Sequence, residues 1–141
     1  MKVVRAGAVS SQRRTSDQFT GPAFGDVIHE PATKDDGARV NLVLFEPRAR
    51  TWWHRHERGQ TIYVTAGQGY IKTEGQDGAR IRAGDTVIVS PGEWHWHGGT
   101  PTTFVLHLTV NSGNEGSTEW RGVEVGDEEY LAEFADGDPR D

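Results

Sequence analysis

The chain has 141 residues, and its 15 basic and 21 acidic side chains give a formal net charge of −6 at pH 7. This length fits one domain with one hydrophobic core, and no block of lysine or arginine provides the basic patch that a nucleic-acid partner requires. Cysteine is absent, which excludes disulfides, thiolate metal ligands and cysteine nucleophiles. Imidazole and oxygen groups therefore remain as the candidate metal ligands.

The chain also lacks the signals of a membrane or exported protein. No 18 apolar residues run together, and residues 1–10 hold no apolar stretch long enough for a signal peptide. These features predict a cytoplasmic protein without a membrane partner. The 18 glycines and 6 prolines are spread through the middle of the chain, which is typical of short strands joined by tight turns.

Residues 1–25 are polar and without periodicity, and we expect them to form an N-terminal arm that ends in an edge strand. His29 follows near Pro31 in a predicted loop, where an isolated histidine fits a surface role. From there the chain alternates extended segments with turns. The expected strands cover residues 41–46, 50–56, 61–65, 69–73, 79–82, 86–90, 94–97 and 103–110.

This spacing of strands and turns, without a helix between them, predicts an antiparallel all-β architecture. A closed β-barrel or a sandwich is the natural result, because closure removes exposed sheet edges. We place the barrel at residues 26–112. A turn at Ala66-Gly67 should separate two of its strands.

Residues 113–141 are expected to form a loop, one short helix and an acidic tail. Asp127 is a plausible N-cap for that helix. Tyr130, Leu131 and Phe134 fall on one face at helical spacing, so the helix should lie on the barrel. We expect the acidic end, residues 136–141, to be frayed.

Five of the six histidines lie in three of the expected strands. His54 and His56 are two residues apart, as are His95 and His97, and side chains at this spacing project from one face of a strand. His107 shares a face with Val105 and Thr109. The tryptophans beside these histidines, Trp94 and Trp96, should face the other way and pack, and an exposed aromatic side would suit a homodimer interface.

A divalent ion of intermediate hardness prefers imidazole nitrogens with one or two oxygen donors. His54, His56 and His95 supply three nitrogens, and Gln60, just past the Gly59 bend, can reach back with its amide oxygen. Glu57 is most simply a solvated turn residue, although it could provide the oxygen ligand in place of Gln60.

These segments resemble the two motifs of the cupin superfamily, Gly-x5-His-x-His-x3,4-Glu-x6-Gly and Gly-x5-Pro-x-Gly-x2-His-x3-Asn. The matching residues are His54, His56, Gln60, Gly67, Gly84, Pro91, Gly92 and His95. Glutamine replaces the motif glutamate, the first glycine and the last asparagine are replaced, and Gly92 lies one position early. The resemblance implies a jelly-roll-like β-barrel that binds a divalent metal.

The sequence is more specifically similar to small bacterial manganese cupins that act as hydroxynitrile lyases. This similarity is carried by segments between residues 49 and 130, among them Ala49-Arg-Thr, Ser90-Pro-Gly-Glu and Asp127-Glu-x-Tyr130. It implies that His54, His56, Gln60 and His95 hold the metal. It also implies that Thr51, His97 and His107 line the pocket as hydrogen-bonding or acid–base groups.

Three hypotheses about function follow. The first is a metal-dependent lyase that cleaves a small-molecule cyanohydrin to a carbonyl compound and cyanide, with a pocket histidine as the base. The second is a dioxygenase that uses Fe(II) or Ni(II), and the third is a non-enzymatic protein that binds a metal or a small ligand. Mn(II) is the metal that the resemblance favours, with Fe(II), Ni(II), Co(II) and Zn(II) as alternatives.

Overall fold

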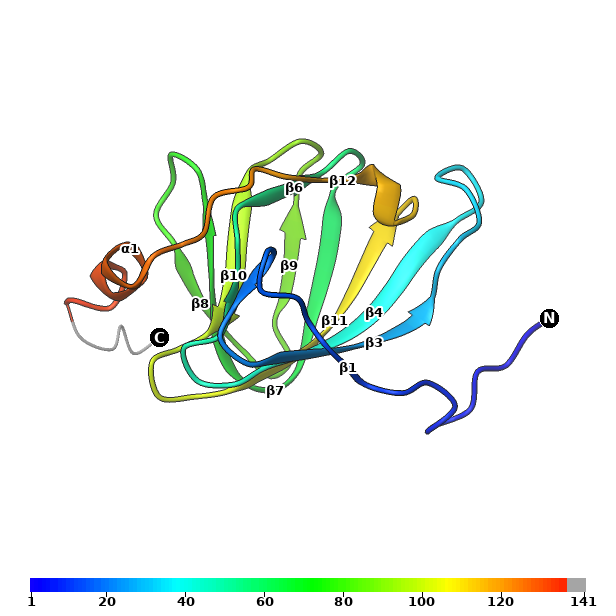
Figure 1. The fold of residues 1–141 in the computed structure, drawn as a ribbon, viewed down its shortest axis with the longest axis horizontal. Coiled ribbons are helices and arrows are strands. Elements are labelled where there is room, and N and C mark those ends of the chain that lie inside the picture. The colour runs from blue at the N-terminus through cyan, green and yellow to red at the C-terminus, as the bar shows by residue number, and fades with distance from the viewer. Residues whose placement is uncertain (137–141) are drawn as a thin grey trace.

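The computed structural model describes residues 1–136, and within them the chain forms a curled antiparallel sheet with one short helix near its C-terminal end (Figure 1). The all-β prediction is therefore confirmed. The residues of the predicted acidic tail from 137 onward lie outside the described part. The strands are β1 Gln12–Arg13, β2 Phe19–Thr20, β3 Ala23–His29, β4 Ala38–Phe45, β5 Arg50–Thr51, β6 His54–His56, β7 Gln60–Thr73, β8 Ala79–Arg82, β9 Thr86–Val89, β10 His95–Gly99, β11 Val105–Ser112 and β12 Thr118–Trp120.

The strand order is β1-β3-β4-β11-β7-β10-β5-β2, so the first strand and the short strand β2 end the path at its two sides. Strand β1 pairs only with β3 in this order, so the edge strand of the N-terminal segment is Gln12–Arg13 and lies before the end of the segment where we expected it. Strands β8 and β9 pair with β7, while β6 lies between β10 and β12. Figure 1 shows how this order curls the sheet around an interior.

Strand β7 corrects the expected turn at Ala66-Gly67, because the strand runs without a break from Gln60 to Thr73. Gly67 has a φ of 76°, and the pairing with β11 shifts register between Leu106 and His107. The glycine therefore lets one long strand bend, as bulges do in barrels. Its first half pairs with β9 and β11 and its second half with β8 and β10, so β7 joins the two halves of the sheet.

The C-terminal helix α1, Asp127–Ala132, lies against the outside of the sheet. Its N-cap is Gly126 rather than the predicted Asp127, whose carboxylate instead accepts a hydrogen bond from Arg50 at 2.9 Å. Tyr130 is fully buried, but Leu131 is 40% exposed, so the predicted apolar face was wrong at Leu131. None of the helices in residues 1–136 has the length and apolarity needed to cross a membrane.

Two clusters of buried apolar side chains hold the fold together. The larger lies inside the curled sheet, where alternate residues of β4, β7 and β11 meet. Its members are Ala23, Val43, Phe45, Ala49, Ile62, Val64, Ile71, Ile81, Val89 and Val105. The second cluster lies under α1 and contains Trp53, Tyr70, Trp96, Val125 and Tyr130.

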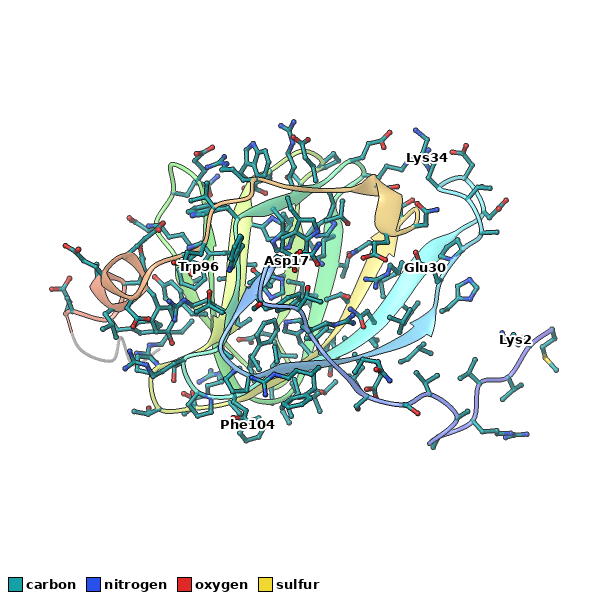
Figure 2. The ribbon with its side chains drawn as sticks, viewed as in Figure 1. Lys2, Asp17, Glu30, Lys34, Trp96 and Phe104 are labelled. Atoms are coloured by element: carbon teal, nitrogen blue, oxygen red, sulfur yellow. The ribbon has the colours of Figure 1, made fainter. Side chains whose placement is uncertain are left out.

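Trp96 is completely buried in this second cluster, on the α1 side of the molecule (Figure 2). The prediction that Trp96 packs away from the histidines is confirmed. Its burial also rules out the idea that Trp96 belongs to an exposed aromatic dimer interface. Trp94 is partly buried and lies beneath the guanidinium groups of Arg55 and Arg121, at 4.6 and 4.2 Å from its ring centre.

Candidate active site

The five strand histidines gather inside the curled sheet, as their spacing predicted, and all of them are buried. Strands β6 and β10 pair with His54 opposite His95, and the two rings lie 4.3 Å apart between centres. His56 lies 5.1 Å from His54 and 5.4 Å from His95 by the same measure. The sixth histidine, His29, is exposed, as expected, but it is the last residue of β3 rather than part of the predicted loop.

Backbone carbonyls fix the orientation of two of these rings. The Nδ1 atoms of His54 and His95 lie 2.9 Å from the carbonyl oxygens of Trp52 and Glu93. A carbonyl can only accept, so each Nδ1 carries the proton and each Nε2 keeps its lone pair. Both rings therefore present an acceptor nitrogen to the interior.

Burial keeps the imidazoles neutral. Desolvation is the first cause that lowers the pKa of His56 to about 3 and of His95 to about 4. It also holds the pKa of His54 well below 6.5, with the charges of His95 and His56 adding to the effect. Neutral imidazole is the form that binds a metal, so the site is ready for coordination near pH 7 without losing a proton.

The arrangement of acceptors around Gln60 fits a cation. The amide oxygen of Gln60 lies 3.0 Å from Nε2 of His95, which is an acceptor because the ring proton is on Nδ1. Two lone pairs at this distance repel each other unless a positive centre lies beside them. Nε2 of His56 is buried and makes no hydrogen bond within residues 1–136, although Gln60 is near enough to oppose the fall in its pKa. These residues fit a divalent ion.

His97 also faces this cluster. Ring nitrogens of His54, His95 and His97 lie within 4.8 Å of one another. Nδ1 of His97 is 3.1 Å from Nε2 of His107, and the backbone N–H of His97 donates to the hydroxyl of Thr51 at 3.1 Å. His107 lies behind His97, so it reaches the pocket through that ring. Burial lowers the pKa of His107 to about 4, and burial together with the charge of His107 holds the pKa of His97 well below 6.5.

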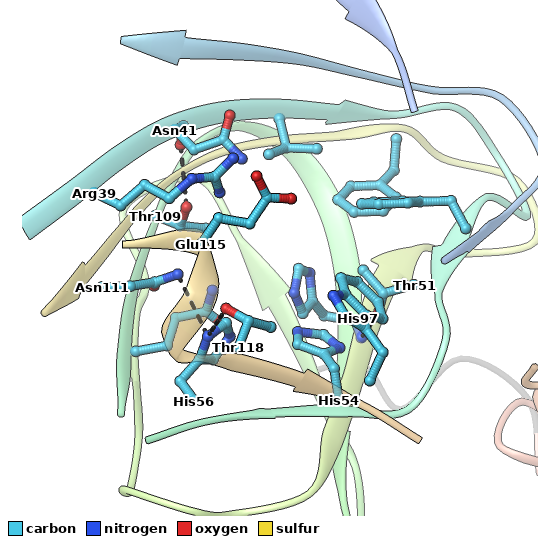
Figure 3. A pocket seen from close by; sticks show the side chains of 15 residues that line it. Arg39, Asn41, Thr51, His54, His56, His97, Thr109, Asn111, Glu115 and Thr118 are labelled. Carbon is cyan, nitrogen blue, oxygen red and sulfur yellow. Dashed lines mark hydrogen bonds between the residues drawn. The ribbon is translucent and has the colours of Figure 1, made fainter. Parts of the chain in front are cut away.

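A cavity that is partly open to solvent leads to these groups (Figure 3). One part of its wall is aromatic, from Phe19, Phe45 and Trp120. The rest is mostly polar, and the lining includes Thr51, His54, His56, Gln60, His97, Arg39, Asn41, Thr109, Asn111, Glu115 and Thr118. Glu57, the alternative oxygen ligand, is exposed and pairs with Lys34 at 3.3 Å, outside this wall.

The sequence reading missed β12, which pairs with β6 and covers two of the histidines. Trp120 stacks on His54 with ring centres 4.6 Å apart, and the hydroxyl of Thr118 lies 3.0 Å from Nδ1 of His56. Thr118 and Trp120 are two residues apart, so they share the inward face of a strand. That short alternation was the available signal, but three residues after a polar loop are too few to predict a strand.

A family model described as "Cupin domain" matches residues 41–111, half of the chain. The chain therefore belongs to the cupin family. Its curled antiparallel sheet is the fold of that family. It is 40% identical over 131 residues to a protein of Granulicella tundricola named (R)-mandelonitrile lyase, covering 92% of this chain and 98% of that one.

Solved structures agree with this assignment. A cupin-like protein of Thermotoga maritima is 30% identical, with a TM-score of 0.76 over 91% of this chain and 94% of that one. The polyketide cyclase RemF of Streptomyces resistomycificus shares only 18% identity, with a TM-score of 0.72 over 93% and 91% of the two chains. RemF therefore supports the fold alone.

Proposed function

We propose that this cupin is a metal-dependent lyase that cleaves a small cyanohydrin into a carbonyl compound and cyanide. The observation that carries the proposal is the convergence of unprotonated imidazole nitrogens and the Gln60 oxygen beside His97, at the end of a cavity that opens to solvent. The similarity to a mandelonitrile lyase over nearly the whole chain supports this reaction class.

His54, His56, Gln60 and His95 would hold the ion, with Mn(II) proposed and Fe(II), Ni(II), Co(II) or Zn(II) as alternatives. When bound, a divalent ion supplies Lewis acidity that makes an adjacent hydroxyl group easier to deprotonate. All four proposed ligands are neutral, so no carboxylate among them would reduce the charge of the ion. This donor set favours polarising chemistry over structural binding.

His97 is placed to take the hydroxyl proton of the substrate. Its Nδ1 can donate to Nε2 of His107, which leaves Nε2 of His97 with a lone pair for the proton. As the O–H bond breaks, the oxygen electrons form the carbonyl double bond and the carbon–carbon bond breaks. The electron pair leaves with cyanide, which takes the proton from His97. The hydroxyl oxygen of Thr51 accepts a hydrogen bond from the backbone N–H of His97 and so helps to hold His97 in place.

The test combines metal analysis with an assay for benzaldehyde release from mandelonitrile. We expect about one equivalent of metal in the wild type and none in the His54→Ala/His95→Ala double variant, which should also release no benzaldehyde. His29→Ala, which removes the exposed histidine, is the matched control and should behave like the wild type. Metal without release, together with oxygen uptake on a diketone, would instead favour the dioxygenase.

A second variant assigns the base. His97→Ala should retain the metal and lose about 10²- to 10⁴-fold in rate, the usual contribution of a general base. Loss of metal from this variant would make His97 a ligand, consistent with its distance from His54 and His95. Full activity would remove His97 from the mechanism.

We also propose a homodimer that forms through the outer face of the sheet. Ile88 pairs with Thr61, and Thr61 pairs with Val110, so these side chains form one row across β9, β7 and β11. Ile88 is 78% exposed and Val110 37%, and Tyr63 beside them is 46% exposed. Sedimentation should show a dimer for the wild type and a monomer for Ile88→Lys. If both the wild type and Ile88→Lys sediment as dimers, the interface does not include Ile88.

A further inference from the structure

The end of the cavity opposite the histidines carries a second set of polar groups that the proposed reaction does not use. Arg39 and Asn41 lie on β4, across the cavity from His54 and His97 (Figure 3). The sequence around Arg39 and Asn41 contains no motif that predicts a site. The two residues face the interior only because β4 pairs with β3 and β11.

Arg39 is held in place by one hydrogen bond from its Nε atom, which leaves its terminal nitrogens available. Its side chain is 13% exposed, and its Nε donates to Glu30 at 2.5 Å. The two terminal nitrogens of the guanidinium make no hydrogen bond within the described residues, and the side chain lines the cavity. A fork of two N–H donors that is fixed from behind is suited to bind a carboxylate through both oxygens.

Asn41 adds a donor beside Arg39. A terminal nitrogen of Arg14 donates to the amide oxygen of Asn41 at 2.8 Å. This bond fixes the orientation of the amide, because the oxygen faces Arg14 and the NH₂ group is left to face the cavity. Arg39 and Asn41 therefore present donors at one end of the cavity, while the histidines present acceptors at the other.

One negative group shares this end of the cavity. Glu115 is exposed, and its carboxylate points into the space beside Arg39 without an ion pair to Arg39 within 4.0 Å (Figure 3). It would compete with an incoming anion for the guanidinium. Arg39 and His56 nevertheless line the same cavity, so the guanidinium faces the space in which a ligand would lie.

We infer that Arg39 and Asn41 form a carboxylate-binding subsite, and that the cellular substrate is a hydroxylated aromatic molecule with a carboxylate at the end remote from its hydroxyl group. The aromatic wall of Phe19, Phe45 and Trp120 lies beside the histidine end of the cavity, where Trp120 stacks on His54 and Phe45 contacts His97, and it suits an aromatic ring next to the reacting group. The inference rests on the proposed function for the reacting end of the molecule and deepens it by naming the substrate class.

The test measures binding rather than turnover, so its outcome is independent of cyanohydrin cleavage. Titration calorimetry compares 4-formylbenzoate with the neutral 4-formylbenzamide on the purified protein. The wild type should bind the carboxylate about tenfold more tightly than the amide, as a charge-assisted pair of hydrogen bonds predicts. Arg39→Met should abolish this preference and leave binding of the amide within about twofold, because the amide needs no positive charge.

Glu115→Gln provides the opposite change at an exposed position. Removing its negative charge should tighten binding of 4-formylbenzoate about two- to fivefold and leave the amide unchanged. Arg58→Met, which removes a surface arginine paired with Asp35 outside the cavity, is the matched control and should change neither ligand.

The inference is overturned if the wild type binds the two ligands equally, or if a folded Arg39→Met protein keeps its preference for the carboxylate. Should Arg39→Met fail to fold, Glu115→Gln decides, and unchanged carboxylate binding by that variant overturns the inference. A clear carboxylate preference in a protein that does not cleave mandelonitrile would keep the subsite and reject the proposed reaction.

Discussion

Strand β10 has two buried faces whose chemistry is opposite. On its inner face, His95 and His97 meet polar neighbours, and on its outer face Trp96 packs under α1. In the outer cluster the hydroxyl of Tyr130 donates to the carbonyl of Gly99 at 2.8 Å, and that of Tyr70 to Glu133 at the same distance. The polar groups there have partners, so this face serves stability.

Within residues 1–136, the inner side of the sheet instead retains buried atoms that have no hydrogen-bond partner, among them Nε2 of His56, Nδ1 of His107 and Oδ1 of Asn111. Such atoms cost stability, and proteins keep them where a ligand will use them. The stabilising residues therefore lie on the outer side of the sheet and the candidate functional residues on its inner side. Changes to one face should alter the unfolding free energy, and changes to the other should alter binding and pH response.

The largest effect should come from the outer face. Trp96→Ala removes a completely buried indole and leaves a cavity, which should lower the free energy of unfolding by about 3 to 5 kcal/mol. Urea denaturation followed by circular dichroism measures this change. Trp52→Ala, at a partly exposed position, is the control and should cost less. If Trp96→Ala and Trp52→Ala lower the free energy of unfolding equally, the burial of Trp96 under α1 does not contribute the expected stability.

The second effect concerns pH and the inner face. The pKa values of His56, His95 and His107 are lowered to about 3, 4 and 4, whereas in the unfolded chain they return to about 6.5. The unfolded state then binds more protons, so stability should fall as pH drops below about 6.5 toward 4. Each histidine contributes up to about 1.4 kcal/mol per pH unit.

This pH dependence is measured by urea denaturation of chelator-treated protein at pH 7.5, 6 and 5. His107→Phe should reduce the slope by about one proton, because it removes one buried titrating group. His29→Ala removes an exposed histidine and should leave the slope unchanged. A slope that His107→Phe does not alter would contradict the buried, neutral state of this ring.

A smaller effect concerns β12, whose Trp120 packs against His54 on the inner side of the sheet. Trp120→Leu removes the ring stacked on His54 and should weaken metal binding about tenfold, the lower end of the effect of residues that orient a metal-binding side chain. Competition with a metal chelator measures this affinity. Trp94→Leu is a matched control, because Trp94 contacts surface arginines rather than the histidines. Unchanged affinity in Trp120→Leu would make the stack incidental.

The smallest effect should come from the solvent side of α1. Leu131→Gln replaces a 40%-exposed side chain with one of similar helix propensity, and should change the free energy of unfolding by about 0.5 kcal/mol. Tyr130→Phe, at the buried neighbour, should cost more because it leaves the carbonyl of Gly99 without its donor. Both are compared by thermal unfolding, and a larger loss in Leu131→Gln would reverse this order.

The sequence alone determined the all-β fold and the faces of the strands, because alternation in a strand is a local property. His54 with His56, and His95 with His97, could therefore be placed on common inner faces, and Trp96 on the outer one. The family motifs extended this to the metal-binding expectation. Local patterns could not distinguish a turn from a bend within a strand. At Gly67 the sequence predicted a turn, but the strand continues and bends there.

Only the tertiary structure decided which distant segments complete the site. Trp120 covers His54, and Arg39 with Asn41 faces the histidines, because strands separated in sequence pair side by side. The structure also placed His107 behind His97 and directed Asp127 to Arg50 instead of the helix N-cap. These contacts depend on the curl and register of the whole sheet, and no short stretch of sequence encodes register between strands so far apart.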